Sequence, residues 1–293
     1  MANRSIFSIF LVAIILSWLG PTKLTAEDFV IPIDSEDIYF WHILMAALEA
    51  AGGQHTLSRY KMAENIPQTR TVRAMLDDSS PYNVIFTGHN KERENALIQI
   101  DVPLTRGLFG YRVFVIHPQD APMFNGINSL QGLATRITVG SGSSWPDTTI
   151  LRKAGFTVST SNTGTLWDML ARGRFTAFPR SVFEVTGELG ARKNTAQDQP
   201  LMIEETVMLH YPFDVFFYVA PNDTTRAEII KQGLDRIYAN GTFMRIFNSN
   251  LEIKTAMDRA SIQKRKIITL ENPLNSERIN SIPARFWHTF NQD

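Results

Sequence analysis

Polar and cationic side chains follow two of the predicted strands and a later Gly-Arg pair, in turns of the kind with which α/β proteins commonly build clefts for small molecules. Thr87 ends a short apolar strand and Arg93 follows shortly after it, Ser143 and Ser144 follow a second strand, and Arg180 comes soon after a Gly-Arg pair. A guanidinium holds a carboxylate through two parallel hydrogen bonds, and free N–H groups at a helix N-terminus also bind anions. These residues therefore predict a cleft that binds a small anionic group.

Each of these residues also has a purely structural interpretation. Arg93 could be a solvent-exposed arginine of a short helix, and Arg180 could form an ion pair with a neighbouring acid such as Glu184. A Gly-Ser turn before a helix occurs in many βα loops, and no lysine follows it to make a nucleotide-binding phosphate loop. Both interpretations remain open from the sequence alone.

Aromatic residues lie near the same turns. Tyr39 and Phe40 follow the first predicted strand, and Trp145 directly follows the Ser143–Ser144 turn. Aromatic walls with a few polar groups are typical of small-molecule pockets. We expect Trp145 and either Tyr39 or Phe40 to contact a ligand, although packing in the core is the competing role for each of them.

Residues for catalysis or metal binding form no recognisable pattern. The six histidines are scattered without paired metal-ligand spacing, cysteine is absent, and there is no Gly-x-Ser-x-Gly nucleophile motif. We therefore expect no catalytic residue, metal or cofactor. An enzyme on this chain would need an acid–base pair, for which Glu184 and His89 are the candidates.

Strands and helices are predicted to alternate along the chain. Apolar runs at 29–33, 83–87, 136–140 and 156–159 read as strands, and helices are expected at 68–76, 146–154 and 166–171, with a capping box at Thr225 and Glu228 starting a later helix. This alternation predicts an α/β fold with mainly parallel sheets. The segment 267–293 reads as an irregular surface tail.

Two long extended runs, at 110–117 and 207–220, suggest two passages between lobes. We expect residues 27–115 and 213–293 to form a discontinuous first lobe, with residues 116–212 as an inserted second lobe. Two strand-like crossings suit a hinge that closes around a ligand. A single continuous sheet of similar length is the alternative.

Residues 1–26 have the layout of a secretory signal peptide. Arg4 precedes an apolar stretch at 6–19, and Leu24-Thr25-Ala26 offers a small-residue cleavage site. The alternative is an uncleaved anchor, but the stretch of about 14 residues is shorter than the roughly 20 that span a bilayer. We expect cleavage, export to the periplasm and a soluble, monomeric mature protein.

Charge composition argues against nucleic acid as a partner. The chain has 29 basic and 29 acidic side chains, and two of the basic ones, Arg4 and Lys23, fall in the leader, which leaves a mature net charge near −2. No basic stripe appears in the sequence. Without cysteine the protein cannot use disulfides or a lipid anchor on a leader cysteine, so its core must stabilise it.

Four segments together with the leader resemble the extracytoplasmic solute-binding proteins of the polar amino-acid type. The segments are YNVIFTGHNKER, PLTRGLFGYRVFVI, TRITVGSGSSWPDTTILRKAGF and LWDMLARGRFTAFPRSVFEV. The resemblance implies a two-lobed type II periplasmic-binding-protein fold, in which two mixed-sheet α/β domains are joined by two hinge crossings. It also implies a Gram-negative bacterium, binding without chemistry, and an ATP-driven membrane permease as partner. A sensory or interaction module, or less favourably a secreted dehydratase or lyase, are alternatives on the same fold.

The resemblance also assigns roles to residues. It implies that Arg93 holds the α-carboxylate of an amino-acid-like ligand and that Ser143 or Ser144 completes this clamp from the second lobe. Members that bind α-amino acids carry an aspartate after the Gly-Arg segment for the ammonium group, whereas this chain has Arg180 and Ser181 there. A cation at that place would favour a second anionic group on the ligand.

Overall fold

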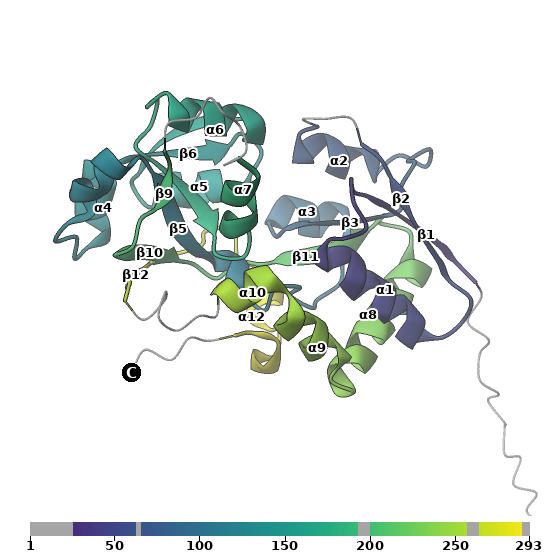
Figure 1. The fold of residues 1–293 in the computed structure, drawn as a ribbon. Helices are drawn as coiled ribbons and strands as arrows, with labels where there is room; N and C mark the ends of the chain where they lie inside the picture. Colours follow the sequence, from purple (N-terminus) through teal and green to yellow (C-terminus); the bar gives the residue numbers. More distant parts are fainter. Residues whose placement is uncertain (1–25, 63–65, 193–199, 257–263, 289–293) are drawn as a thin grey trace, which may run out of the picture.

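The computed structural model describes residues 26–62, 66–192, 200–256 and 264–288. Within these ranges the chain forms two α/β lobes that lie side by side (Figure 1). Residues 1–25 of the predicted leader lie outside the described residues. Of the helices within the described ranges, none is long and apolar enough to cross a membrane.

The first lobe contains two small sheets. Its strands are β1 (Asp28–Pro32), β2 (Thr56–Tyr60), β3 (Val84–Gly88), β4 (Ile98–Gln99) and β11 (Val215–Val219). Strands β1 and β2 pair in parallel, while β3, β11 and β4 form an antiparallel sheet in that order. The backbone N–H of Val30 donates to the Asn83 side chain and the N–H of Asn83 donates to the Val30 carbonyl, which joins the two sheets.

Helices cover the sheets of this lobe. They are α1 (Tyr39–Ala51), α2 (Gln68–Ala74), α3 (Lys91–Ala96), η1 (Leu108–Gly110), α8 (Thr224–Ala239), α9 (Thr242–Ser249), α10 (Leu251–Ala256), α12 (Glu277–Asn280) and η3 (Ala284–Phe286). The predicted capping box of α8, with Thr225 as N-cap, is wrong, because the helix begins two residues earlier. Asp223 is its N-cap and accepts a hydrogen bond from the N–H of Arg226.

The second lobe is built on one large mixed sheet. Its strands are β5 (Tyr111–Ile116), β6 (Thr138–Gly142), β7 (Thr157–Ser161), β8 (Ala177–Ser181), β9 (Met202–Ile203), β10 (Val207–His210) and β12 (Lys266–Thr269). The order is β12-β10-β5-β8-β6-β7, with β9 paired to β5. Because β5 runs antiparallel to both β8 and β10, the sheet is mixed rather than mainly parallel.

Among the described residues, five helices accompany this sheet. They are η2 (Pro118–Phe124), α4 (Leu130–Arg136), α5 (Pro146–Lys153), α6 (Thr163–Ala171) and α7 (Val185–Arg192). Ser129 and Asn162 cap α4 and α6 with their side-chain oxygens, which satisfies N–H groups that have no partner inside the helix.

Strands β5 and β12 lie in the second-lobe sheet, although the predicted boundaries place nearly all of β5 and the whole of β12 in the first lobe. A strand belongs to the sheet that satisfies its backbone groups. Strand β5 pairs along most of its length with β8, and β12 pairs with β10. The predicted irregular tail therefore contains a strand and a helix.

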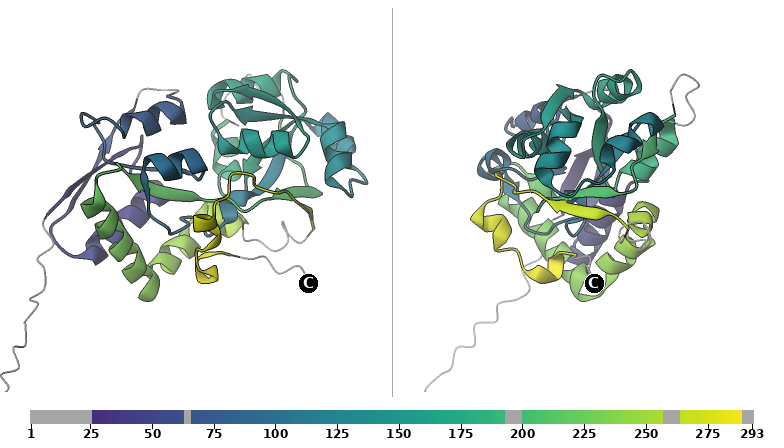
Figure 2. Two further views of the ribbon diagram at one scale, coloured as in Figure 1. Left: turned by 180° about the vertical axis from the view of Figure 1, so that it is seen from behind. Right: turned by 90° about the vertical axis from the view of Figure 1, so that its left-hand side faces the viewer.

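The C-terminal segment contacts both lobes. Seen from behind, it is the yellow chain that runs from the second lobe toward the junction (Figure 2). After β12, the carbonyl of Leu274 lies 3.1 Å from the His89 ring, and the Ser276 hydroxyl donates to Glu94 at 2.6 Å. This segment thus adds a contact between the lobes beyond the two predicted crossings.

The two crossings pack directly against each other. The carboxylate of Asp214, just before β11, accepts hydrogen bonds from the N–H and hydroxyl of Thr105 and from the N–H of Gly107. A Cβ on Gly110 would lie 2.1 Å from the Tyr211 carbonyl oxygen. The backbones approach so closely that only glycine fits at this position.

The contact between α1 and α8 yields a stability prediction. A Cβ at Gly233 of α8 would lie 2.0 Å from the Ala47 carbonyl oxygen of α1. Gly233→Ala should therefore destabilise the protein by about 1–3 kcal/mol in urea unfolding, the usual cost of overpacking. Gly190→Ala in α7 is the matched control, because nothing lies within 4 Å of its Cβ position. It should be neutral or stabilise by up to about 1 kcal/mol, and equal effects at both sites would contradict the packing argument.

Candidate functional site

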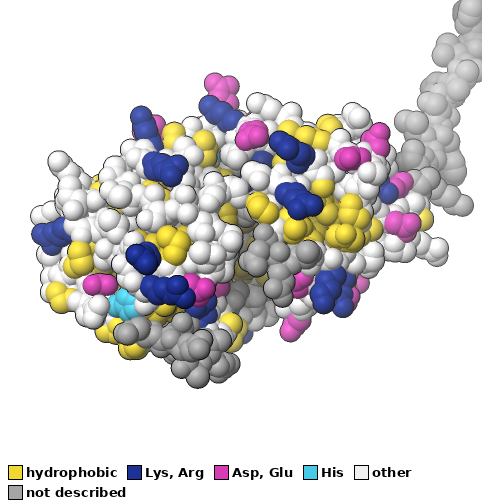
Figure 3. Space-filling model, turned by 90° about the horizontal axis from the view of Figure 1, so that it is seen from above, with side chains coloured by type: hydrophobic (Ala, Val, Ile, Leu, Met, Phe, Trp, Pro, Cys, Tyr) yellow, Lys and Arg dark blue, Asp and Glu magenta, His cyan; other side chains and the backbone are white. Residues whose placement is uncertain are grey.

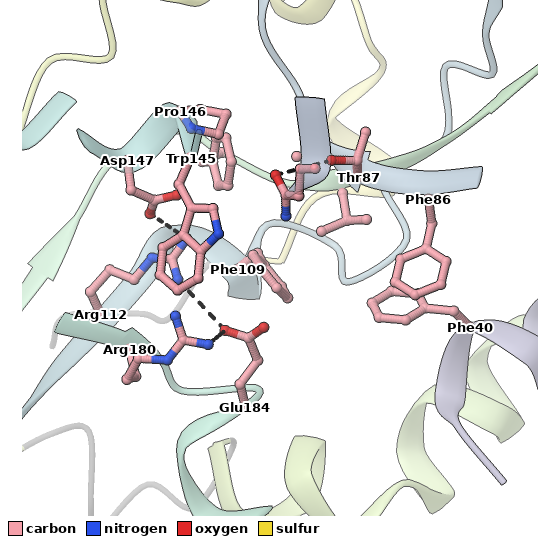
Figure 4. Close-up of a pocket in the computed structure, with 14 residues that line it drawn as sticks. Phe40, Phe86, Thr87, Phe109, Arg112, Trp145, Pro146, Asp147, Arg180 and Glu184 are labelled. Atoms are coloured by element: carbon pink, nitrogen blue, oxygen red, sulfur yellow. Dashed lines mark hydrogen bonds and ion pairs between the residues drawn. The ribbon is translucent and has the colours of Figure 1, made fainter. Parts of the chain in front are cut away.

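Two adjoining hollows lie between the lobes. We call the smaller one, of about 120 Å³, the inner cavity, and the larger one, of about 810 Å³, the outer cleft. The inner cavity is lined by Phe40, Gln68, Phe86, Thr87, Gly88, Phe109, Arg112, Trp145, Pro146, Asp147, Arg180, Glu184, Phe213 and Val215. Its residues come from both lobes, and its charged residues come from the second lobe alone (Figure 4).

Arg112 of β5 is the deepest charged group of the inner cavity. Its side chain is 2% exposed, and its Nη2 lies 2.6 Å from Oδ1 of Asp147. The Tyr211 hydroxyl donates to the same carboxylate oxygen. Phe109 and Phe213 stack near the guanidinium, with ring centroids 5.1 and 5.6 Å from its central carbon. Ion pairing and aromatic faces together offset the cost of burying this charge.

Arg180 of β8 forms a second, denser ion-pair cluster. Its Nη2 lies 2.9 Å from Glu184 and 2.6 Å from Glu188, and its Nε donates to the same Glu188 at 2.7 Å. The ring of Trp145 lies 4.8 Å from its central carbon. The structure therefore shows the ion pairing that the sequence left open, and the same guanidinium also lines both hollows.

Glu184 connects the two arginines. Its Oε2 contacts Arg180 and lies 3.9 Å from Nη1 of Arg112. Burial raises the pKa of Glu184 to about 7, while Arg180 and Arg112 oppose that increase and Glu188 and Asp147 add to it. The cavity thus contains a carboxyl group that can exchange a proton near neutral pH.

The opposite end of the inner cavity is apolar. Phe40 of α1 stacks on Phe86 of β3, with ring centroids 4.2 Å apart. Phe109 lies between this wall and the charged groups (Figure 4). A ligand that fits here has a charged head and an apolar body.

Arg93 lies behind the first-lobe wall of the inner cavity. Asn90 caps α3, whose third residue is Arg93, so the side chain turns back under β3. Its Nη1 donates to the hydroxyl of Thr87 and the carbonyl of Gly88, and its Nη2 donates to Gln68 at 3.0 Å. These three partners line the cavity, whereas Arg93 itself does not.

The remaining predicted residues lie at different depths. Ser143 and Ser144 line the outer cleft, and the Ser144 carbonyl accepts a 3.4 Å hydrogen bond from Arg93 across the lobes. Trp145 lines both hollows. Of the two aromatic alternatives, Phe40 lines the inner cavity, while Tyr39 is buried and its hydroxyl donates to the Leu104 carbonyl.

Arg112 and Asp147 are not among the residues predicted from the sequence. A signal for Arg112 was present, because an arginine inside the apolar run at 110–117 must find a buried partner. The partner could not be read from spacing. Asp147 lies in the first turn of α5, at the positive N-terminal end of the helix. The sequence predicted that a ligand anion would bind at this helix end, and the Asp147 carboxylate lies there instead.

His89 does not join Glu184. Its ring is buried, with Nδ1 3.1 Å from Gln99 and Nε2 3.1 Å from the Leu274 carbonyl, and it lines neither hollow. Burial lowers the pKa of His89. Across the described parts of the chain there is also no group of three or more histidine, cysteine or acidic side chains that could hold a metal ion.

Charge is dispersed over the face of the molecule seen from above. Basic and acidic side chains alternate with hydrophobic ones on both lobes, and neither sign forms a continuous stripe on that face (Figure 3). This face therefore offers no basic surface for a nucleic-acid backbone.

The burial of Arg112 predicts a large effect at its partner. Asp147→Asn should cost about 3–5 kcal/mol of unfolding free energy in urea, because it removes the nearest counter-ion of a buried guanidinium and leaves only Glu184 at 3.9 Å. Asp168→Asn is the matched control, since Asp168 pairs with Arg192 at 3.3 Å but its side chain is 60% exposed. The control should cost less than about 1 kcal/mol. Similar losses in both variants would show that the Arg112 charge is not effectively desolvated.

Comparison with known proteins finds similar folds among solved structures. No protein-family model matches the sequence, and neither does any curated protein. An ancestral arginine-binding protein bound to arginine superposes with a TM-score of 0.55 at 15% identity, covering 77% of this chain and 97% of that one. A histidine kinase sensor domain similar to periplasmic binding proteins gives 0.54 at 15% identity, with 78% and 96% covered.

A third structure is an ancestral amino-acid-binding protein described as a precursor of cyclohexadienyl dehydratase. Its TM-score is 0.52 at 10% identity, and 77% of this chain and 94% of that chain are covered. At such identities the likeness concerns the fold. Two α/β lobes on mixed sheets, matched over nearly the full length of these structures, show that the chain has the two-lobed type II periplasmic-binding-protein fold.

Proposed function

We propose that the protein binds a small carboxylate-bearing solute, anionic or zwitterionic and amino-acid-like, in the inner cavity without chemistry. The observation that carries this proposal is the composition of the cavity, with Arg112, Arg180 and Glu184 at one end and Phe40 and Phe86 at the other. A few charged groups within aromatic walls fix the orientation of a small ligand. Because the walls come from both lobes, closure around the ligand would bury it.

Arg93 supports the same proposal from the first lobe. Its side chain is 3% exposed, and its hydrogen bonds go only to uncharged oxygens of Thr87, Gly88, Gln68 and Ser144. None of the ion pairs among the described residues involves Arg93. A buried cation without a counter-ion is costly. A ligand carboxylate that displaces the Gln68 side chain would supply the missing charge.

Delivery to a membrane partner is the proposed purpose of binding. With the leader removed, the protein would work in the periplasm and hand its solute to an ATP-driven permease that recognises the closed form. The similarity of the fold to a histidine kinase sensor domain supports sensing as the second candidate, with a sensor in place of the permease.

An enzymatic role is the less favoured alternative. Glu184, with its pKa near 7, has the properties of a general acid or base, and one structure of the same fold is a dehydratase precursor. However, the candidate partner His89 lies outside both hollows. Turnover of a bound solute, followed by product analysis, would distinguish this alternative from binding alone.

A ligand screen tests the proposed function directly. The mature chain, residues 27–293, would be refolded from denaturant to remove bound solute and then heated with amino acids, dicarboxylates, keto acids and small peptides. A specific ligand at 100 times its dissociation constant should add about 2.7 kcal/mol of stability and raise the melting temperature. No shift with any compound would count against solute binding and favour a role in partner contact.

Substitution of Arg93 tests the first-lobe contact. Arg93→Ala should weaken binding of a screened ligand by about 2–4 kcal/mol, as measured by calorimetry, because one side of a buried charge pair is lost. Arg236→Ala is the control, since this α8 arginine likewise donates to uncharged oxygens, the carbonyls of Ala50 and Ala51, and lines neither hollow. Unchanged affinity in Arg93→Ala would remove Arg93 from the site.

A further inference from the structure

Two buried guanidinium groups converge on one carboxylate oxygen. Oε2 of Glu184 lies 2.9 Å from Nη2 of Arg180 and 3.9 Å from Nη1 of Arg112 (Figure 4). A carboxylate is an acceptor-only group, and guanidinium groups are its preferred partners in proteins. This position in the inner cavity is therefore already occupied by an oxyanion, supplied by the chain itself.

Arg112 has more donors than the chain satisfies. Its Nε is buried and has no hydrogen-bond partner among the described residues, although the side chain is only 2% exposed. Buried donors are nearly always paired, so an orphaned one calls for an explanation. Arg112 lines the inner cavity, so its guanidinium has unused donor capacity beside the space that a ligand would occupy.

Glu184 is the acidic residue of this cluster that is easiest to displace. Asp147 is held by Arg112 and by the Tyr211 hydroxyl, and Glu188 receives two hydrogen bonds from Arg180. Glu184 receives one hydrogen bond, its side chain is 27% exposed, and it lines both hollows. Its second oxygen points away from both arginines (Figure 4). The side chain can therefore leave toward the outer cleft.

We propose that Arg112 and Arg180 form an oxyanion subsite, and that a ligand carboxylate replaces the carboxylate of Glu184 there while Glu184 takes up one proton. This inference rests on the proposed function, because it requires the inner cavity to be the ligand site. In this scheme the Glu184 carboxylate competes with the ligand carboxylate for Arg112 and Arg180. This competition determines which ligands bind and at what pH. The ligands favoured by protonation are carboxylates without an ammonium group nearby.

The charges around Glu184 determine the direction of the pH dependence. Arg180 of β8 and Arg112 of β5 favour its ionised form, while Glu188 of α7 and Asp147 of α5 oppose it. The cavity residues from α1, α2 and β3 are uncharged. Since its pKa is about 7, Glu184 is protonated below that pH and ionised above it. Carboxylate affinity should thus be constant below pH 7 and fall by about tenfold per unit above it.

Matched ligand pairs test this scheme on the mature chain. The probes are 3-phenylpropanoate with L-phenylalanine, glutarate with L-glutamate, and propanoate with L-alanine, each pair differing only by the amino group. Calorimetry from pH 6.5 to 8.5, in buffers of different ionisation enthalpy, gives affinity and the number of protons taken up. For the wild-type protein at pH 8, we expect the protein to take up nearly one proton for each carboxylate ligand that binds.

Two variants distinguish a specific role of Glu184 from an effect of the total negative charge of the cluster. Glu184→Gln should bind the carboxylate at pH 8 at least about tenfold more tightly than the wild type, with no pH dependence and no proton uptake. Glu188→Gln removes the other carboxylate on Arg180 but leaves the bridge to Arg112 in place. It should keep the proton uptake and the roughly tenfold fall per pH unit, with the onset of the fall moved to lower pH because the Glu188 charge no longer opposes ionisation of Glu184.

The opposing outcomes are distinct. Carboxylate binding to the wild type without proton uptake overturns the scheme, even if Glu184→Gln fails to fold. Weaker binding of the amino acid by Glu184→Gln, with the carboxylate unaffected, would mean that Glu184 holds the ammonium group instead. The absence of binding by all six compounds to all three proteins would count against the proposed function itself.

Discussion

The buried charge of Arg112 is the constraint on which the site depends. Strand β5 lies inside the second-lobe sheet, between β8 and β10, and the Arg112 side chain is only 2% exposed, so its guanidinium is largely removed from solvent. Its charge must be compensated within the fold. Asp147 is therefore held at the start of α5, Tyr211 is oriented toward the same carboxylate, and two phenylalanine rings stack beside it. The arrangement of side chains at the charged end of the cavity is thus the one that compensates the charge of Arg112.

The same constraint connects the site to the crossings between the lobes. Tyr211 and Asp214 lie in the short segment between β10 and β11, and Asp214 fixes the other crossing through Thr105 and Gly107. Phe213, from this segment, lines the inner cavity. A change of hinge geometry would therefore move a wall of the cavity and the hydroxyl that supports Asp147. In the proposed binding role, the residues that contact the ligand would therefore be the ones that move when the lobes close.

Local features of this fold could be predicted from the sequence, whereas long-range pairings could not. Strand β3, the turn to Arg93 and helix α5 follow from short-range hydrophobic patterns and turn residues. The pairing of β12 with β10 joins distant segments, and nothing in either segment specifies the other. For the site, Trp145 and either Tyr39 or Phe40 were predicted as aromatic walls, and Trp145 and Phe40 line the inner cavity whereas Tyr39 does not. The partners of Arg112 and Arg180 depend on which side chains the fold brings together.

Formal charge balance explains how such a cavity can discriminate among small solutes. Arg93 gives the first-lobe side one uncompensated positive charge. On the second-lobe side, Arg112 and Arg180 face three carboxylates, those of Asp147, Glu184 and Glu188, which leaves one negative charge. With Glu184 ionised, the cavity lies between opposite charges and suits a dipolar ligand. With Glu184 protonated the second-lobe side is neutral, Arg93 remains, and the cavity suits an anion. Under the proposed scheme, one proton would thereby change the class of solute that the same walls accept.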